Sequence, residues 1–200
     1  MGPAILGPAI GLLELDSVAA GIEVGDAMVK RAPVAVLRAG TVQPGKYLVL
    51  VAGEVADVEE ALDAGGTVGG ASIIGTLFLP DAHPEVVEAI GGRRRDGAGE
   101  ALGVIETPTV AAIIDAADAG LKGARVALLE LRLADGLGGK GYLLFDGPVA
   151  EVEAAVELGT ARIAGSGPAA HRVIAQLHPE MRENLEADAR FRDRVRERAG

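Results

Sequence analysis

The chain has 200 residues, no cysteine and a formal net charge of −10. That length suffices for one large domain or two domains of about 100 residues each. The absence of cysteine excludes disulfides, thiolate zinc sites and cysteine-ligated iron–sulfur clusters. The acidic charge argues against nucleic-acid binding, which needs a basic face. Residues 1–10 are apolar but lack a basic segment and are interrupted by Pro3 and Pro8, so we expect no signal peptide. No apolar run reaches the roughly 20 residues of a membrane span.

Taken in chain order, the first half predicts four strands and two helices. Hydrophobic runs, helical spacing of apolar residues and Gly/Pro punctuation locate them. The predicted elements are a strand Ile10–Leu15, a helix Ser17–Arg31, a strand from Val34–Leu37, a loop Thr41–Lys46, a strand Lys46–Ala52, a helix Val55–Gly65 and a strand Ser72–Leu79.

The chain repeats itself. At an offset of 92, Gly11, Glu14 and Lys30 recur as Gly103, Glu106 and Lys122, and about half of the positions from 11 to 37 are identical. After the loop the offset becomes 94, so the second loop is two residues longer. Chance does not produce such a match, and the pattern indicates an internal duplication.

The second half therefore predicts the same elements. They are a strand Leu102–Glu106, a helix Thr109–Gly123, a second strand, a strand Gly141–Asp146, a helix Val149–Gly159 and a strand His171–Leu177. The order β-α-β-β-α-β is typical of a ferredoxin-like α+β domain. We expect two tandem domains, over residues 9–90 and 101–180, joined by a polar glycine-rich linker, 91–100. The charged tail, 181–200, is compatible with a solvated or frayed terminal helix, and partner docking is the alternative.

Four segments of the first half are distinctive in combination: Gly11–Glu14, Gly25–Val34, the Pro44-Gly45-Lys46 loop and Gly53–Val58. Together they resemble bacterial microcompartment shell proteins. The duplication makes the chain similar to the tandem-domain class, whose members form trimers that imitate a shell hexamer. The resemblance covers about residues 9–179, in the ordinary strand-first order rather than a circularly permuted one. It implies two tandem BMC domains in a pseudo-hexameric homotrimer, located in the shell of a cytoplasmic microcompartment. Its implied partners are hexameric and pentameric shell proteins and encapsulated enzymes.

One position departs from the group that the chain resembles most, the propanediol-utilisation type. Members of that group carry a Cys-Pro-Gly-Lys pore loop whose three cysteines hold an iron–sulfur cluster on the trimer axis. Here the loop begins with Gln43. An amide cannot supply the soft anionic ligand that a cluster needs. We therefore expect no metal and no cofactor.

The resemblance implies that the two loops line a central pore. The expected pore-lining residues are Val42, Gln43, Pro44, Gly45, Gly136, Leu137, Gly138 and Gly139. Glycines remove side chains from a constriction and let backbone N–H groups face inward, which favours polar or anionic metabolites over cations. The alternative is that these glycines only form tight hairpin turns. A phosphate-binding loop is disfavoured because the segment lacks P-loop spacing and opens no helix.

Lys30 and Lys122 occupy matching places near the ends of the first helices. They complement the helix dipole, or, as the resemblance implies, they contact neighbouring tiles together with His83. The arginine that the family often has near that histidine is missing here. His83 and His178 lack a second ligand at metal-binding spacing.

Glu14 and Glu106 are expected to be structural, as acceptors of backbone or inter-domain hydrogen bonds, because no nucleophile or acid/base group accompanies them. We predict a structural shell tile with a pore for small polar metabolites, and no enzyme. The alternatives are a trimeric ferredoxin-like small-molecule sensor or regulator, which needs a mobile loop and a basic phosphate pocket, and an enzyme on the same fold.

Overall fold

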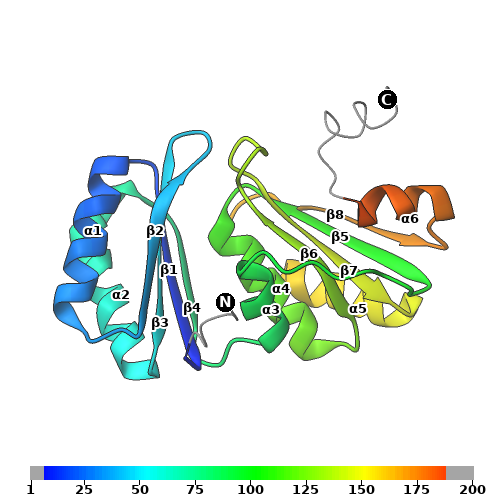
Figure 1. Cartoon of the computed structure of the whole chain (residues 1–200), viewed down its shortest axis with the longest axis horizontal. Coiled ribbons are helices and arrows are strands. Elements are labelled where there is room, and N and C mark those ends of the chain that lie inside the picture. Colours follow the sequence, from blue (N-terminus) through cyan, green and yellow to red (C-terminus); the bar gives the residue numbers. More distant parts are fainter. Residues whose placement is uncertain (1–6, 188–200) are drawn as a thin grey trace.

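The computed structural model describes residues 7–187. Each half of the chain forms a four-stranded antiparallel sheet with two long helices on one face (Figure 1). The first half contains β1 (Ala9–Leu15), α1 (Val18–Arg31), β2 (Val36–Val42), β3 (Lys46–Gly53), α2 (Val55–Gly69), a 3-10 turn (Gly70–Ser72), β4 (Ile73–Leu79) and α3 (Pro84–Ile90). The second contains β5 (Ala101–Thr107), α4 (Val110–Gly123), β6 (Ala127–Leu133), β7 (Gly141–Gly147), α5 (Val149–Arg162), β8 (Ala170–Ala175) and α6 (Pro179–Glu186).

The strand orders are β2-β3-β1-β4 and β6-β7-β5-β8, the same arrangement twice. Both place the first and third strands of the repeat at the centre of the sheet and the second and fourth at its edges. The predicted α+β ferredoxin-like fold is confirmed in both halves.

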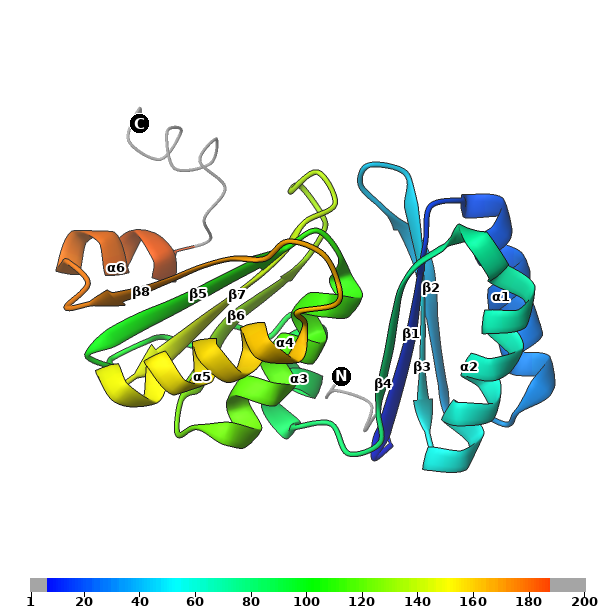
Figure 2. The same ribbon diagram turned by 180° about the vertical axis from the view of Figure 1, so that it is seen from behind.

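Successive side chains of the central strand β1 point to opposite faces of the sheet, so their contacts identify the two faces. Leu13 of β1 packs under the helices near Gly65 and Met28, while Ile10 and Leu12 face away from them. In the first half that outer face meets the second half of the chain: Ile10 and Leu12 share a core with α3 and α4. The chain therefore folds as two domains that lie side by side (Figure 2), and they share an apolar interface.

Two features differ from the sequence-based expectation. Strand β2 starts later than Val34 and continues to Val42, because Thr41 and Val42 pair with Tyr47 and Lys46. The predicted loop therefore shrinks to a tight hairpin. Helix α3 was not predicted, although His83 followed by Pro84 is a helix-start signal: the His83 Nδ1 atom accepts a hydrogen bond from the Glu85 N–H at 3.3 Å.

The charged tail is only partly covered by the described residues. Its first part forms α6, which packs on the second sheet. The arginine-rich part, residues 188–200, lies outside the described residues.

Candidate functional site

The two predicted pore loops lie next to each other, at the same end of the two sheets (Figures 1 and 2). In the first, the Gly45 N–H donates to the Val42 carbonyl at 3.1 Å, which closes the hairpin. In the second, Leu137 donates to Ala134 at 3.0 Å. Most of the predicted pore residues are exposed: Gln43, Pro44, Gly45, Gly136 and Gly138 are exposed, Val42 and Leu137 are half-buried, and Gly139 is buried.

The loops touch at Gly139. Its φ is +90°, a conformation that favours glycine. A Cβ atom built there would lie 2.7 Å from Pro44 Cδ and 3.0 Å from the Gln43 carbonyl oxygen. The missing side chain of Gly139 therefore allows the first loop to rest on the second.

Lys46, at the end of the first loop, is not a free cation. Its ammonium group donates to the Gly139 carbonyl at 3.0 Å, to the Pro108 carbonyl at 2.8 Å and to Glu14 Oε1 at 2.8 Å. All three donor positions of the ammonium group are thus used. Two of the acceptors belong to the second domain, so Lys46 holds the domains together at the base of the loops.

Glu14 completes this contact. Its side chain is fully buried, and Oε2 accepts hydrogen bonds from the Val110 N–H at 2.6 Å and the Ala111 N–H at 3.2 Å. These N–H groups belong to the first turn of α4, where donors lack intrahelical partners and the helix dipole favours a negative charge. The predicted structural role of Glu14 is confirmed. We call Glu14, Lys46 and the N-terminus of α4 the inner clamp.

The opposite rim of the domain contact contains Lys122 and His83. Asp118 accepts from the His83 N–H at 2.8 Å and pairs with Lys122 Nζ at 2.7 Å, and Lys122 also donates to the Asp81 carbonyl. Lys30 instead pairs with Asp26 at 2.6 Å, and both side chains are well exposed. These placements leave the tile-edge role of the three residues a prediction.

Helix α3 is fastened to the linker by charge. Arg95 contacts Glu88 at 2.7 Å and Glu85 at 2.9 Å, and Arg93 contacts Glu88 at 2.8 Å. The hydrogen bond from Arg95 lowers the pKa of Glu88 below its ordinary value. Elsewhere, burial raises the pKa of Asp115 although Arg162 pairs with it at 3.0 Å.

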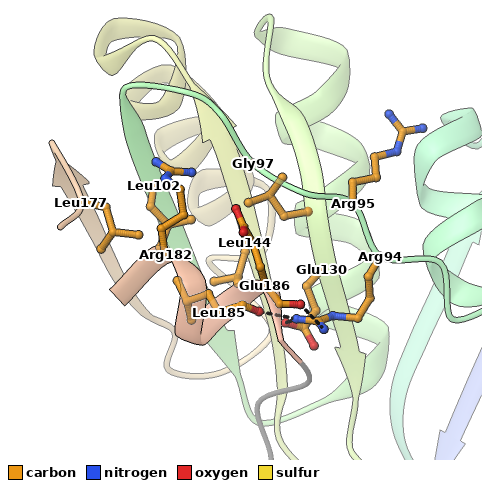
Figure 3. Close-up of a pocket in the computed structure, with 11 residues that line it drawn as sticks. Arg94, Arg95, Gly97, Leu102, Glu130, Leu144, Leu177, Arg182, Leu185 and Glu186 are labelled. Carbon is orange, nitrogen blue, oxygen red and sulfur yellow. Dashed lines mark hydrogen bonds and ion pairs between the residues drawn. The ribbon is translucent and has the colours of Figure 1, made fainter. Parts of the chain in front are cut away.

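Helix α6 covers part of the outer face of the second sheet (Figure 3). Leu185 packs against Leu102 and Leu144, and Arg182 pairs with Asp146 at 3.0 Å. The space left beneath the helix is about 10 Å³, too small for a ligand.

Arg94 anchors the end of α6. Its guanidinium donates to the Leu185 carbonyl at 2.6 Å and to Glu130 at 3.0 Å. Burial, reinforced by the Glu130 carboxylate, raises the pKa of the nearby Tyr142 to about 12.

The corresponding face of the first domain holds an open groove of about 420 Å³. It lies between that sheet, α3 and the second domain, and its apolar lining includes Leu12, Leu48, Leu50, Val87, Ile90 and Leu133. The equivalent outer faces of the two sheets are therefore covered differently.

Within residues 7–187, no group of three or more His, Asp or Glu side chains is arranged to hold a metal ion. No helix there is long and apolar enough to cross a membrane.

Sequence reasoning placed the loops but missed the role of Lys46. The Pro-Gly-Lys run indicated a loop residue, whereas the structure assigns its lysine to the domain contact. The only sequence signal was the recurrence of lysine after both loops, at Lys46 and Lys140.

Comparison with known proteins identifies the family. The model of the BMC domain matches residues 9–82 and again 101–177. The chain is 39% identical to the bacterial microcompartment shell protein PduT of Citrobacter freundii over 174 residues, covering 86% of this chain and 95% of PduT. It is 38% identical over 89 residues to the carboxysome shell protein CcmK2 of Synechococcus elongatus, covering 43% of this chain and 81% of CcmK2.

Two solved structures of microcompartment proteins resemble this chain. A microcompartment protein from Desulfitobacterium hafniense superposes with a TM-score of 0.75 at 40% identity, covering 88% of this chain and 98% of that one. A fused permuted hexameric shell protein from the RMM microcompartment shares the fold, with a TM-score of 0.57 at 20% identity, covering 80% and 83% of the two chains. The chain thus belongs to the BMC-domain family of bacterial microcompartment shell proteins, with two BMC domains in tandem.

Proposed function

We propose that this chain is a structural tile of a microcompartment shell: a homotrimer whose six domains form a ring around a pore for small polar metabolites. The tile contacts hexameric and pentameric shell proteins at its edges and encapsulated enzymes at one face, and it performs no catalysis. The predicted domain bounds, 9–90 and 101–180, are part of this proposal. The shell proteins among its relatives support the structural role.

The trimer is inferred from two surfaces of the chain, each of which is exposed although the equivalent surface of the other domain is buried. On α4, Val110, Ile114 and Leu121 are buried, and this helix packs against the first domain. The equivalent residues of α1, at the repeat offset of 92, are exposed: Val18 by 37%, Ile22 by 58% and Val29 by 40%. Helix α1 therefore presents, unburied, the stripe that α4 uses inside the chain.

The complementary surface is also present. The outer face of the first sheet buries Leu77 and Leu79 of β4 in the core shared with α4. In the second sheet the edge strand β8 is exposed along most of its length, including Ile174. Each chain thus buries one contact, between α4 and the first sheet. It also exposes the two surfaces equivalent to that contact, α1 on the first domain and β8 on the second.

Surfaces of this kind join copies head to tail, and such a contact closes into a ring when its rotation allows. The internal contact already sets the rotation between two domains. Repeating it through three chains gives six domains in one ring, with the six loops at the centre. That arrangement supports a pore lined by Gln43 amides and glycine backbone groups.

The pairing of Lys46 supports a pore without a free cation from the first loop. Lys46 is tied to Glu14 and to carbonyl groups, so its charge is neutralised at the base of the loop. Gln43 contributes an amide that both donates and accepts hydrogen bonds. We expect selection by diameter and hydrogen bonding rather than by net charge.

Sedimentation and crosslinking test the proposed trimer and the central position of its loops. Sedimentation should give a trimer, and the Gln43→Cys variant, which holds the only cysteine of the chain, should crosslink between chains with a short bis-maleimide. Asp63→Cys, on the exposed surface of α2, is the control and should not crosslink at that length. A chain that stays monomeric at high concentration would overturn the trimer, and a trimer without crosslinks would overturn the central position of the loop.

A further inference from the structure

The inner clamp has a second, incomplete copy. Glu106 of β5 occupies the register position of Glu14 in β1: Glu14 lies opposite Leu48 of β3, and Glu106 lies opposite Tyr142 of β7. The repeat relates these two pairs, so the two carboxylates project from equivalent places on the outer faces of the two sheets.

The second copy already holds its lysine. Lys140 pairs with Glu106 Oε1 at 2.8 Å, the same distance that separates Lys46 from Glu14. The difference is burial: the side chains of Glu106 and Lys140 are 44% and 57% exposed, against 0% and 15% for Glu14 and Lys46. Within residues 7–187, no helix N-terminus or carbonyl group contacts the second copy in the way that buries the inner clamp.

An equivalent helix N-terminus exists at α1. Ser17 caps α1 through a hydrogen bond from the Ala20 N–H at 3.3 Å, as Thr109 caps α4 through the Ala112 N–H at 3.3 Å. The repeat offset makes Val18 the equivalent of Val110, whose N–H binds Glu14. This end of α1 adjoins the exposed apolar stripe described above.

We propose that Glu106 of one copy accepts hydrogen bonds from the Val18 and Ala19 N–H groups of the next copy. Lys140 beside it donates to the Asp16 and Gly45 carbonyl oxygens of that next copy. We call this contact the outer clamp. The inference rests on the proposed trimer, and it names the polar contact that fixes how the copies join.

The carboxylate of Glu106 favours head-to-tail docking of two copies over other arrangements. A carboxylate buried in an interface must be paired, because an unpaired buried charge is costly. The first-turn N–H groups of a helix are unpaired within the helix and carry the positive end of its dipole. A copy docked through another surface leaves Glu106 without these donors. The outer clamp therefore selects the head-to-tail orientation, while the apolar stripe supplies most of the affinity.

The clamp also joins the loops. Lys46 ties the first loop to Gly139 of the second loop within one chain. Lys140, bound to Gly45 of the next chain, ties the second loop to the following first loop. The lysine after each loop then closes the ring of six loops instead of charging the pore.

The experiment measures trimer dissociation by sedimentation over a dilution series of the full chain. Glu106→Gln weakens the acceptor, and Glu153→Gln, at an exposed site of α5, is its charge-matched control. Val18→Pro removes the donor at the first helical position, where proline fits the helix. Val18→Ala shortens the same side chain and keeps the N–H.

We expect Glu106→Gln and Val18→Pro each to weaken every contact about tenfold relative to its control, the size of a charge-assisted hydrogen bond. Because the ring has three such contacts, the overall dissociation constant should rise about a thousandfold. Combining the two changes should cost less than the sum of the single changes, since both act on the same hydrogen bond between Glu106 and the Val18 N–H. Circular dichroism of the dissociated chains checks that each variant is folded.

The outcomes separate the two proposals. A wild-type chain that never associates overturns the trimer. A wild-type trimer whose Glu106→Gln and Val18→Pro variants dissociate like Glu153→Gln and Val18→Ala overturns the outer clamp and leaves the trimer standing. If one variant fails to fold, the other and its control decide. Additive losses in the double variant also contradict the direct contact.

Discussion

Single residues decide how the loops meet, and Gly139 is the sharpest case. Two separate features require glycine at this position: its φ is +90°, and Pro44 approaches so closely that a Cβ has no room. Gly136 shares only the first feature, because its φ is +75° and a Cβ there meets nothing within 4 Å. The pair therefore separates backbone strain from the loop contact.

We predict that Gly136→Ala costs about 1 kcal/mol of unfolding free energy, the strain of a left-handed residue. Gly139→Ala should cost about 2–4 kcal/mol, since the loop must also shift. Urea unfolding of the two variants at low protein concentration measures both. Equal losses would show that the contact of Gly139 with the first loop adds nothing to stability.

At the scale of elements, the two repeats use the same helix in different surroundings. Ile114 of α4 is fully buried and Ile22 of α1 is exposed, although the duplication makes them equivalent. An exposed residue contributes little to the stability of the chain that carries it, and a large buried one contributes much.

We predict that Ile114→Ala costs about 2–5 kcal/mol of unfolding free energy in the isolated chain. Ile22→Ala should change it by about 0.5 kcal/mol or less, yet it should weaken trimer formation. Thermal unfolding at low concentration tests the two changes in unfolding free energy. Sedimentation tests the effect of Ile22→Ala on trimer formation. If Ile22→Ala leaves association unchanged, α1 is not the docking helix.

At the scale of the whole molecule, the proposed edge role of Lys30 concerns the contact between tiles rather than between chains of one tile. Lys30 is exposed and paired only with Asp26 in the interactions described above. Its neighbour Arg31 is also exposed and paired with a carboxylate, Glu60. Charge and helix position are thus nearly the same for the two residues.

We expect concentrated wild-type protein, alone or mixed with a hexameric shell protein, to form sheets or tubes in electron micrographs. Lys30→Ala should remove these assemblies and leave the trimer mass unchanged, whereas Arg31→Ala should keep both. Loss of the sheets in both variants would point to a general charge effect and against a specific edge role for Lys30.

The fold was readable from the sequence for a physical reason. Apolar spacing distinguishes strands from helices, and the duplication let each half check the other. Strand β2 was placed too early because its less buried residues, such as the exposed Arg38 and the half-buried Gly40, do not look like a strand on their own. They are held by pairing with Leu50 and Leu48 of β3. Pairing is a tertiary fact that a run of residues does not contain.

What the sequence by itself determined is the duplicated ferredoxin-like domain, the family, the positions of the two loops and the absence of cysteine at Gln43. What only the tertiary structure decided is how equivalent residues divide their work. Glu14 and Glu106 are indistinguishable in sequence pattern, but one is buried against a helix N-terminus and the other is exposed. The reason is connectivity: the linker brings the outer face of the first sheet against α4 of the second domain, whereas Glu106 and Lys140 stay exposed at the surface.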